Sequence, residues 1–113
     1  MANSFVNKKA DLTSNSATTL YTVPSFSTAV IKSILVSEDS GNADTITVTI
    51  TDTDDAVFSL FKTKSISANG TTELLSAPLV VAESEAIKVT AATANRLHVV
   101  LSALEIKPRA VTS

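Results

Sequence analysis

The sequence predicts an all-β protein: a single-domain antiparallel β-sandwich of eight or nine strands with a jelly-roll-like topology. Short apolar segments recur along the 113 residues with turn residues between them, and none of these segments has the period of a helix. Apolar residues make up 44% of the chain but aromatic residues only 4%, so the core has to be built mainly from Ile, Val, Leu and Ala. Aliphatic and β-branched residues of this kind are typical of strands.

The first predicted strands lie in the N-terminal half of the chain. Residues 18–23 form a short strand that ends at Pro24, which lacks a backbone N–H and suits a strand end. Residues 28–38 have apolar side chains on both faces, which indicates a central strand. The turn-forming residues 39–44 are expected to connect it, as a hairpin, to the strand that follows at 45–53.

The strand at residues 45–53 has threonine at every second position, with Ile46, Val48 and Ile50 between the first four. A period of two places the aliphatic side chains on the core face and the threonines on the opposite face. Three interpretations of the threonine face remain open: a solvated exterior, a contact face between subunits in which threonines pair across strands, and an ice-binding array. The residues of the candidate contact face are Thr45, Thr47, Thr49, Thr51 and Thr53.

The second half of the chain is predicted to continue the sandwich. Asn69-Gly70 is typical of a two-residue hairpin turn of the primed type. In the last strand, period-two alternation divides the side chains between two faces. Leu97, Val99, Leu101 and Ala103 share one face, and His98, Val100, Ser102 and Leu104 share the other. The predicted strands are residues 56–64, 65–68, 71–75, 77–81, 86–91 and 97–106.

We predict three parts of the chain: a polar N-terminal arm at residues 1–9, the β-sandwich domain at 10–106, and a C-terminal tail at 107–113. The arm and the tail are polar, terminal and too small to fold alone, so we expect them to become ordered on a partner. The candidate partner-binding residues are Ala2, Asn3, Ser4, Phe5, Val6, Asn7, Lys8, Lys9, Lys107 and Arg109.

Charge and composition exclude several classes of function. The formal net charge of −2 gives no basic surface for nucleic acid, so no nucleic-acid partner is expected. The chain has no cysteine, and therefore neither disulfides nor thiolate metal sites. No segment approaches the roughly 18 apolar residues of a membrane span, and the N-terminus lacks the apolar core of a signal peptide. We expect a chain that is made in the cytoplasm, is soluble there and has no membrane partner.

Candidate catalytic and metal-binding residues are few. His98 is the only histidine, and its position within a strand favours a packed or hydrogen-bonded side chain over a metal ligand or a catalytic base. Asp52, Asp54 and Asp55 have oxygens that could hold Ca²⁺, but acidic turn residues that bind their own backbone are the preferred interpretation.

Enzymatic activity is not predicted. A carboxylate pair for glycoside hydrolysis could come from Glu73, Glu83 and Glu85, but the aromatic platforms that sugar binding usually needs are almost missing. No nucleophile, base and orienting group can be named together. We therefore nominate no catalytic, cofactor-binding or metal-binding residues and expect no cofactor.

Several segments resemble small structural proteins of tailed-bacteriophage virions, especially those of phages of marine bacteria and cyanobacteria. The resemblance begins with Tyr21-Thr22-Val23-Pro24, the strand Thr28–Val36 and the Gly-Asn-Ala-Asp turn before a Thr/Val strand. It continues with Pro78–Val81 followed by the acidic turn Glu83–Glu85, and with the closing strand Leu97–Ile106. It spans roughly residues 5–106.

The resemblance implies a non-enzymatic virion protein whose location is the virion. Such proteins include capsid decoration (cement) proteins, which bind the outer capsid shell and stabilise it, and subunits of tails, necks and fibres. The implied partners are the major capsid protein or another virion protein, together with further copies of the chain in a homo-oligomer, of which a trimer is favoured. A more distant alternative is a carbohydrate-binding module for host attachment.

Overall fold

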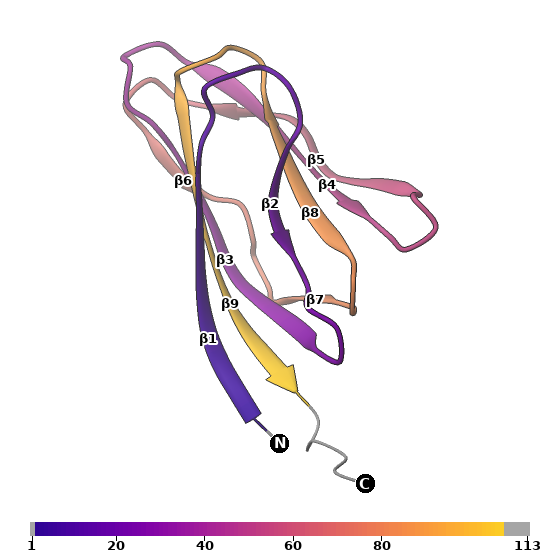
Figure 1. Ribbon diagram of the computed structural model, residues 1–113. Coiled ribbons are helices and arrows are strands. Elements are labelled where there is room, and N and C mark those ends of the chain that lie inside the picture. Colours follow the sequence, from indigo (N-terminus) through magenta and orange to yellow (C-terminus); the bar gives the residue numbers. More distant parts are fainter. Residues whose placement is uncertain (1, 108–113) are drawn as a thin grey trace, which may run out of the picture.

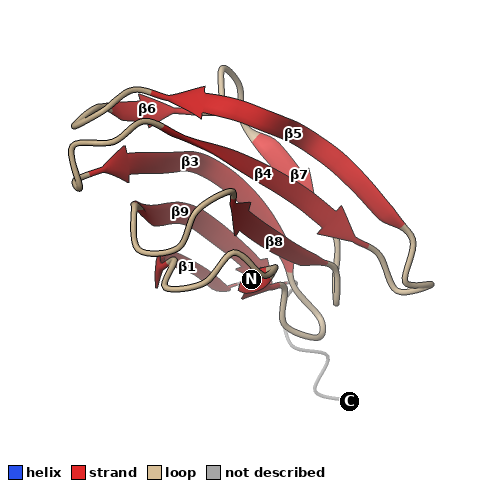
Figure 2. Ribbon diagram, turned by 90° about the horizontal axis from the view of Figure 1, so that it is seen from above, coloured by secondary structure: helices blue, strands red, loops and turns tan. Residues whose placement is uncertain are grey.

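The computed structural model describes residues 2–107 and contains nine strands and no helix in that range. Figure 1 traces the strands along the chain, and Figure 2, seen from above, shows only strands and loops. The strands are β1 (Ala2–Asp11), β2 (Thr18–Thr22), β3 (Thr28–Glu38), β4 (Asp44–Thr51), β5 (Val57–Ile66), β6 (Thr71–Glu73), β7 (Leu79–Val81), β8 (Ala86–Ala91) and β9 (Leu97–Lys107).

The strands form two antiparallel sheets, as the sequence predicts. Sheet A has the order β1-β9-β3-β6, with β7 also paired to β3, and sheet B has the order β2-β8-β4-β5. These are the strand orders of a jelly roll in which one strand is divided into β6 and β7. Within this arrangement β4 and β5 are the only strands adjacent in the sequence that pair with each other in residues 2–107. The predicted β-sandwich is confirmed.

The core lies between the sheets and is aliphatic, as the composition requires. The predicted faces of β9 are confirmed, because Leu97, Val99, Leu101 and Ala103 are buried and the alternate residues are only half-buried. In β3 a register shift between Ile31 and Ser33 interrupts the alternation. Ile31 and Ile34 are consequently both in the core, whereas Val30 and Leu35 lie on the outer face.

Two predicted hairpins are wrong. Residues 39–43 carry the chain from β3 in sheet A to β4 in sheet B, and residues 67–70 carry it from β5 in sheet B to β6 in sheet A. A type I′ turn at Asn69-Gly70 would need positive φ at both residues, but only Asn69 has it, at 56°. The same turn residues occur in hairpins within a sheet and in connections between two sheets. The local sequence therefore did not distinguish a hairpin from a connection between sheets.

The prediction of a separate N-terminal arm is also wrong. Residues 2–9 belong to β1, which pairs with β9 over ten residues and forms an edge of sheet A. The physical reason is the backbone ladder with β9, because among residues 3–11 only Val6 and Ala10 pack against the core. At the other terminus Lys107 is the last residue of β9. The rest of the predicted tail, residues 108–113 with Arg109, lies outside the described residues.

Candidate functional site

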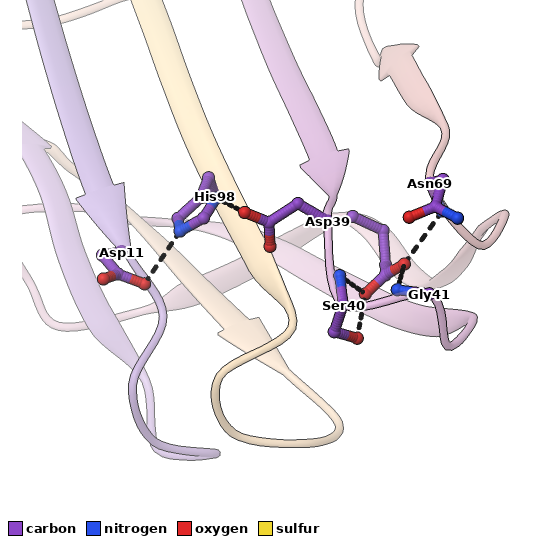
Figure 3. A network of polar contacts seen from close by, with 7 residues as sticks. Asp11, Asp39, Ser40, Gly41, Asn69 and His98 are labelled. Atoms are coloured by element: carbon purple, nitrogen blue, oxygen red, sulfur yellow. Dashed lines mark hydrogen bonds and ion pairs between the residues drawn. The ribbon is translucent and has the colours of Figure 1, made fainter.

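His98 lies on the outer face of sheet A and contacts two carboxylates. Its Nε2 is 3.2 Å from Oδ1 of Asp11 at the end of β1, and its Nδ1 is 3.4 Å from Oδ2 of Asp39 beyond the end of β3 (Figure 3). Because the carboxylates contact opposite nitrogens of the ring, they cannot share one metal ion with it. The three side chains connect β1, β9 and the end of β3, which are neighbours in sheet A. None of the three is a hydroxyl or thiol nucleophile.

Asp52 caps the turn between β4 and β5. One of its carboxylate oxygens accepts hydrogen bonds from the backbone N–H groups of Asp54 and Ala56, both at 2.9 Å. This is the turn role that the sequence favours for the acidic segment. Across residues 2–107, no group of three or more His, Asp or Glu side chains is placed to hold a metal ion.

Glu38 organises two loops at one end of the sandwich. Its carboxylate accepts hydrogen bonds from the hydroxyl and backbone N–H of Ser40, from Gly41 N–H at 3.1 Å and from Asn69 N–H at 2.9 Å (Figure 3). Burial raises the pKa of Glu38, but the hydrogen bond from the Ser40 hydroxyl and those from the backbone N–H groups outweigh it and lower the pKa to about 2. Glu38 therefore holds the β3–β4 and β5–β6 connections together as a carboxylate.

The other candidate glutamates have similar structural roles. Glu73 accepts hydrogen bonds from the Ser33 hydroxyl, from Ile34 N–H at 2.8 Å and from Leu75 N–H at 3.2 Å. Burial raises the pKa of Glu73, and these hydrogen bonds more than reverse the effect, so its pKa is lowered. Glu85 accepts from Ala82 N–H at 2.8 Å, and Glu83 accepts from the N–H of Phe26. Each carboxylate stabilises a bulge or a loop, which is not the arrangement of a glycosidase pair.

One buried polar pair was not predicted. Tyr21 in sheet B donates a hydrogen bond from its hydroxyl to Glu105 in sheet A, and both side chains are buried. Burial, the hydrogen bond to Glu105 and the charge of Glu105 all raise the pKa of Tyr21. The alternation of β9 contained a signal for this pair, since Glu105 continues the buried face that begins at Leu97.

The threonine ladder lies on the outer face of sheet B and is shorter than predicted. Thr45, Thr47, Thr49 and Thr51 are half-buried in β4, but Thr53 is an exposed residue of the following turn. Hydroxyls are not repeated regularly beside the ladder. Thr49 lies opposite Ser59 in β5 but opposite Lys88 in β8, and Thr51 lies between Val57 in β5 and Ala86 in β8. The ice-binding interpretation needs a regular array on neighbouring strands, and this sheet does not provide it.

Two members of the ladder have specific surroundings. Thr47 Oγ1 accepts a hydrogen bond from Thr63 N–H at 3.1 Å, where β5 is irregular and Thr63 has a φ of 51°. Thr51 Oγ1 is buried and has no hydrogen-bond partner within residues 2–107. Thr47 therefore stabilises the irregular edge strand β5, whereas the hydroxyl of Thr51 is a buried polar group without a hydrogen bond.

Apolar side chains form a row across the outer face of sheet A. The strand register places Phe5 of β1 opposite Leu104 of β9, Leu104 opposite Val30 of β3, and Val30 opposite Val80 of β7. Cross-strand partners share a face, so these four side chains form a continuous stripe, which we call the apolar row. Its ends are the most exposed, with Phe5 at 87% and Val80 at 65%.

A shallow hollow of about 310 Å³ lies beside the apolar row and is bordered by Phe5, Asn7, Lys32 and Ser102, among others. Phe5 and Asn7 are among the nominated partner-binding residues, all of which, apart from Lys107 and Arg109, lie on β1. The structure thus combines part of the predicted partner-binding segment with apolar residues of three other strands. Sequence reasoning missed this surface, because it depends on the register between distant strands.

Sequence comparison does not identify a relative. No protein-family model matches the chain, and no curated protein matches it in sequence. Within residues 2–107 there is also no helix with the length and hydropathy needed to cross a membrane.

Proposed function

We propose that this chain is a non-enzymatic structural protein of a tailed-bacteriophage virion, and that it decorates the outer capsid shell and stabilises it. The observation that carries the proposal is the apolar row, a stripe of two exposed and two half-buried side chains on one face of the sandwich. Exposed apolar residues that cluster on one face are characteristic of protein interaction sites. The sequence resemblance to small virion proteins supplies the class of partner.

The polar groups support a structural role. The carboxylates of Glu38, Asp52 and Glu73 bind backbone N–H groups of loops and bulges, and Glu105 binds the Tyr21 hydroxyl. These side chains stabilise connections between strands and are engaged in hydrogen bonds that hold the fold. A chain that must remain folded outside a cell without disulfides is well served by such connections.

Decoration would act through many weak contacts. Each copy would cover apolar surface on one or more capsid subunits, and a protein that binds only the assembled shell stabilises that shell by mass action. Copies that also contact one another bind with added avidity, because the second contact is intramolecular.

The proposal is tested by counting copies of the chain in purified virions by quantitative mass spectrometry, with the major capsid protein as the reference. Hundreds of copies, comparable with the major capsid protein, are expected. A few to a few dozen copies would instead assign the chain to a tail, neck or fibre. Its absence from particles would overturn the proposal.

A second experiment tests the apolar row directly. Val80→Asn is expected to weaken binding of the purified chain to capsid shells, because it places an amide in the apolar contact. Phe26→Asn is the matched control: Phe26 is 81% exposed but lies in the β2–β3 loop, outside the row. Equal binding by both variants would exclude the row as the shell-binding surface.

A further inference from the structure

The outer edge of β1 is a long, regular strand edge. β1 pairs with β9 from Ala2 to Asp11 without a register shift, and no strand within residues 2–107 pairs with its other side. Figure 1 shows β1 in indigo at the margin of the fold. Unpaired main-chain groups along such an edge are a template for pairing with another strand.

The hydrogen-bond pattern shows which backbone groups face outward. Leu12 N–H donates to Leu97 C=O at 3.0 Å, in the same register as the β1–β9 ladder. Hydrogen-bonded pairs alternate along an antiparallel ladder, so the even-numbered residues of β1 bond to β9. The odd-numbered residues therefore direct their N–H and C=O groups away from β9. These residues are Asn3, Phe5, Asn7, Lys9 and Asp11, and the C=O of Asp11 already accepts a hydrogen bond from Thr13 N–H.

The other long edge strand, β5, is less regular than β1 and is better protected against pairing. Its pairing with β4 has two register shifts, Thr63 has positive φ, and Lys62 and Lys64 are exposed. Bulges and lysines are the features by which edge strands avoid pairing with other chains. The N-terminal half of β1 has neither, since its ladder is regular and residues 2–7 are uncharged.

We propose that β1 pairs antiparallel with β1 of a second copy, with Val6 opposite Val6 of the partner subunit. In this register the outward groups of Phe5 meet those of the partner's Asn7, and the outward groups of Asn3 meet those of the partner's Lys9. Odd residues face odd residues, so both strands offer hydrogen-bonding groups at the same positions. The contact joins two A sheets into one continuous sheet.

The side chains favour this register. Lys8 lies opposite the partner's Ser4, so like charges do not face each other across the contact. A register centred on Asn7 would instead place Phe5 opposite the partner's Lys9, and one centred on Phe5 would shorten the paired segment. In the proposed register the two Phe5 side chains are diagonal neighbours on the outer face, within reach of each other. The apolar rows of the two copies therefore meet at the dimer axis.

The contact has two-fold symmetry and closes at two copies, because each chain has one β1 edge. It therefore predicts a dimer in place of the trimer expected from the sequence. The inference concerns the purified chain and does not depend on the proposed virion function, so either can fail without the other.

Sedimentation equilibrium of the purified full chain from micromolar to millimolar concentration tests the contact. We expect a reversible species of twice the 11.8 kDa of one chain. Asn7→Pro should be monomeric with an unchanged circular-dichroism spectrum, because the lost N–H faces outward and makes no bond to β9. Phe5→Asn should weaken dimerisation at least tenfold, and the equally exposed Phe26→Asn control should leave it unchanged.

Cross-linking tests the register, and the natural chain has no cysteine to interfere. Val6→Cys is expected to form a disulfide-linked dimer on oxidation, because facing residues of a non-hydrogen-bonded pair have Cα atoms about 4.5 Å apart. Residue 9 faces the partner's Asn3, so Lys9→Cys should form no disulfide-linked dimer. It should run as a single chain under denaturing conditions without reducing agent. A chain that is monomeric at every concentration, or a dimer unaffected by both Asn7→Pro and Phe5→Asn, would overturn the proposal.

Discussion

The hydroxyl of Tyr21 donates a hydrogen bond to the carboxylate of Glu105 and connects sheet B to sheet A through the interior of the sandwich. Both side chains are buried, in a core that is otherwise almost entirely aliphatic. A buried carboxylate is stable only if donors replace its lost hydration, so the two residues depend on each other.

Tyr21→Phe should therefore destabilise the protein by about 2 kcal/mol, because it removes a hydrogen bond to a charged acceptor. Urea denaturation gives the free energy of unfolding. Glu105→Gln in the wild-type and Tyr21→Phe backgrounds completes a double-mutant cycle. If Glu105→Gln has the same cost in both backgrounds, the two residues are not coupled and the interpretation is wrong.

Glu38 should make the protein sensitive to acid. Folding lowers its pKa from the ordinary value of 4.5 to about 2, so the carboxylate stabilises the folded state above pH 4.5. This contribution is lost as the pH falls from 4.5 towards 2. Glu38→Gln should lower the free energy of unfolding above pH 4.5. Urea denaturation at a series of pH values should show this difference from the wild type becoming smaller towards pH 2.

Ser40→Ala provides a graded comparison for Glu38. It removes the hydroxyl donor but keeps the backbone N–H groups that bind the same carboxylate. Its stability at each pH should lie between that of the wild type and that of Glu38→Gln. If the free energies of unfolding of the wild type and Glu38→Gln differ by the same amount across this pH range, the carboxylate is not the acid-sensitive group.

Thr51→Val should stabilise the protein by about 1 kcal/mol, because it replaces a buried hydroxyl without a partner by a methyl group of similar shape. Thr47→Val is the informative comparison, since Thr47 Oγ1 accepts the Thr63 N–H. That variant should be destabilised instead. Thermal unfolding of the two variants distinguishes them, and a loss of stability in Thr51→Val would contradict the assignment.

His98→Ala should change the free energy of unfolding by less than about 1 kcal/mol. Its contacts with Asp11 and Asp39 involve exposed carboxylates, and ion pairs of this kind contribute little. Urea denaturation at low and high salt measures both the size and the screening of the effect. A loss of several kcal/mol would show that His98 has a larger structural role than these two contacts provide.

Local patterns in the sequence were sufficient for much of the fold. The alternation from Leu97 to Leu104 identified both faces of β9, and the acidic turn at Asp52 was correctly interpreted as backbone capping. These predictions succeeded because a strand's period and a turn's hydrogen bonds involve residues that are close in the sequence.

The missed features involve residues that are distant in the sequence. Residues 2–9 looked like a polar arm, because β1 gains its order from the ladder with β9 and contributes few apolar side chains to the core. The two predicted hairpins failed because a turn sequence does not specify whether the next strand joins the same sheet or the opposite one. A shift in the register of β3 likewise moved Ile34 to the face of Ile31.

The sequence by itself determined that this protein is a β-sandwich with an aliphatic core, since side-chain alternation and composition are local properties. Only the tertiary structure decided that Phe5, Leu104, Val30 and Val80 form one row, and that Tyr21 meets Glu105 across the interior. Cross-strand register is set by packing, bulges and loop geometry over the whole chain. A surface made by four strands is therefore fixed only once the chain has folded.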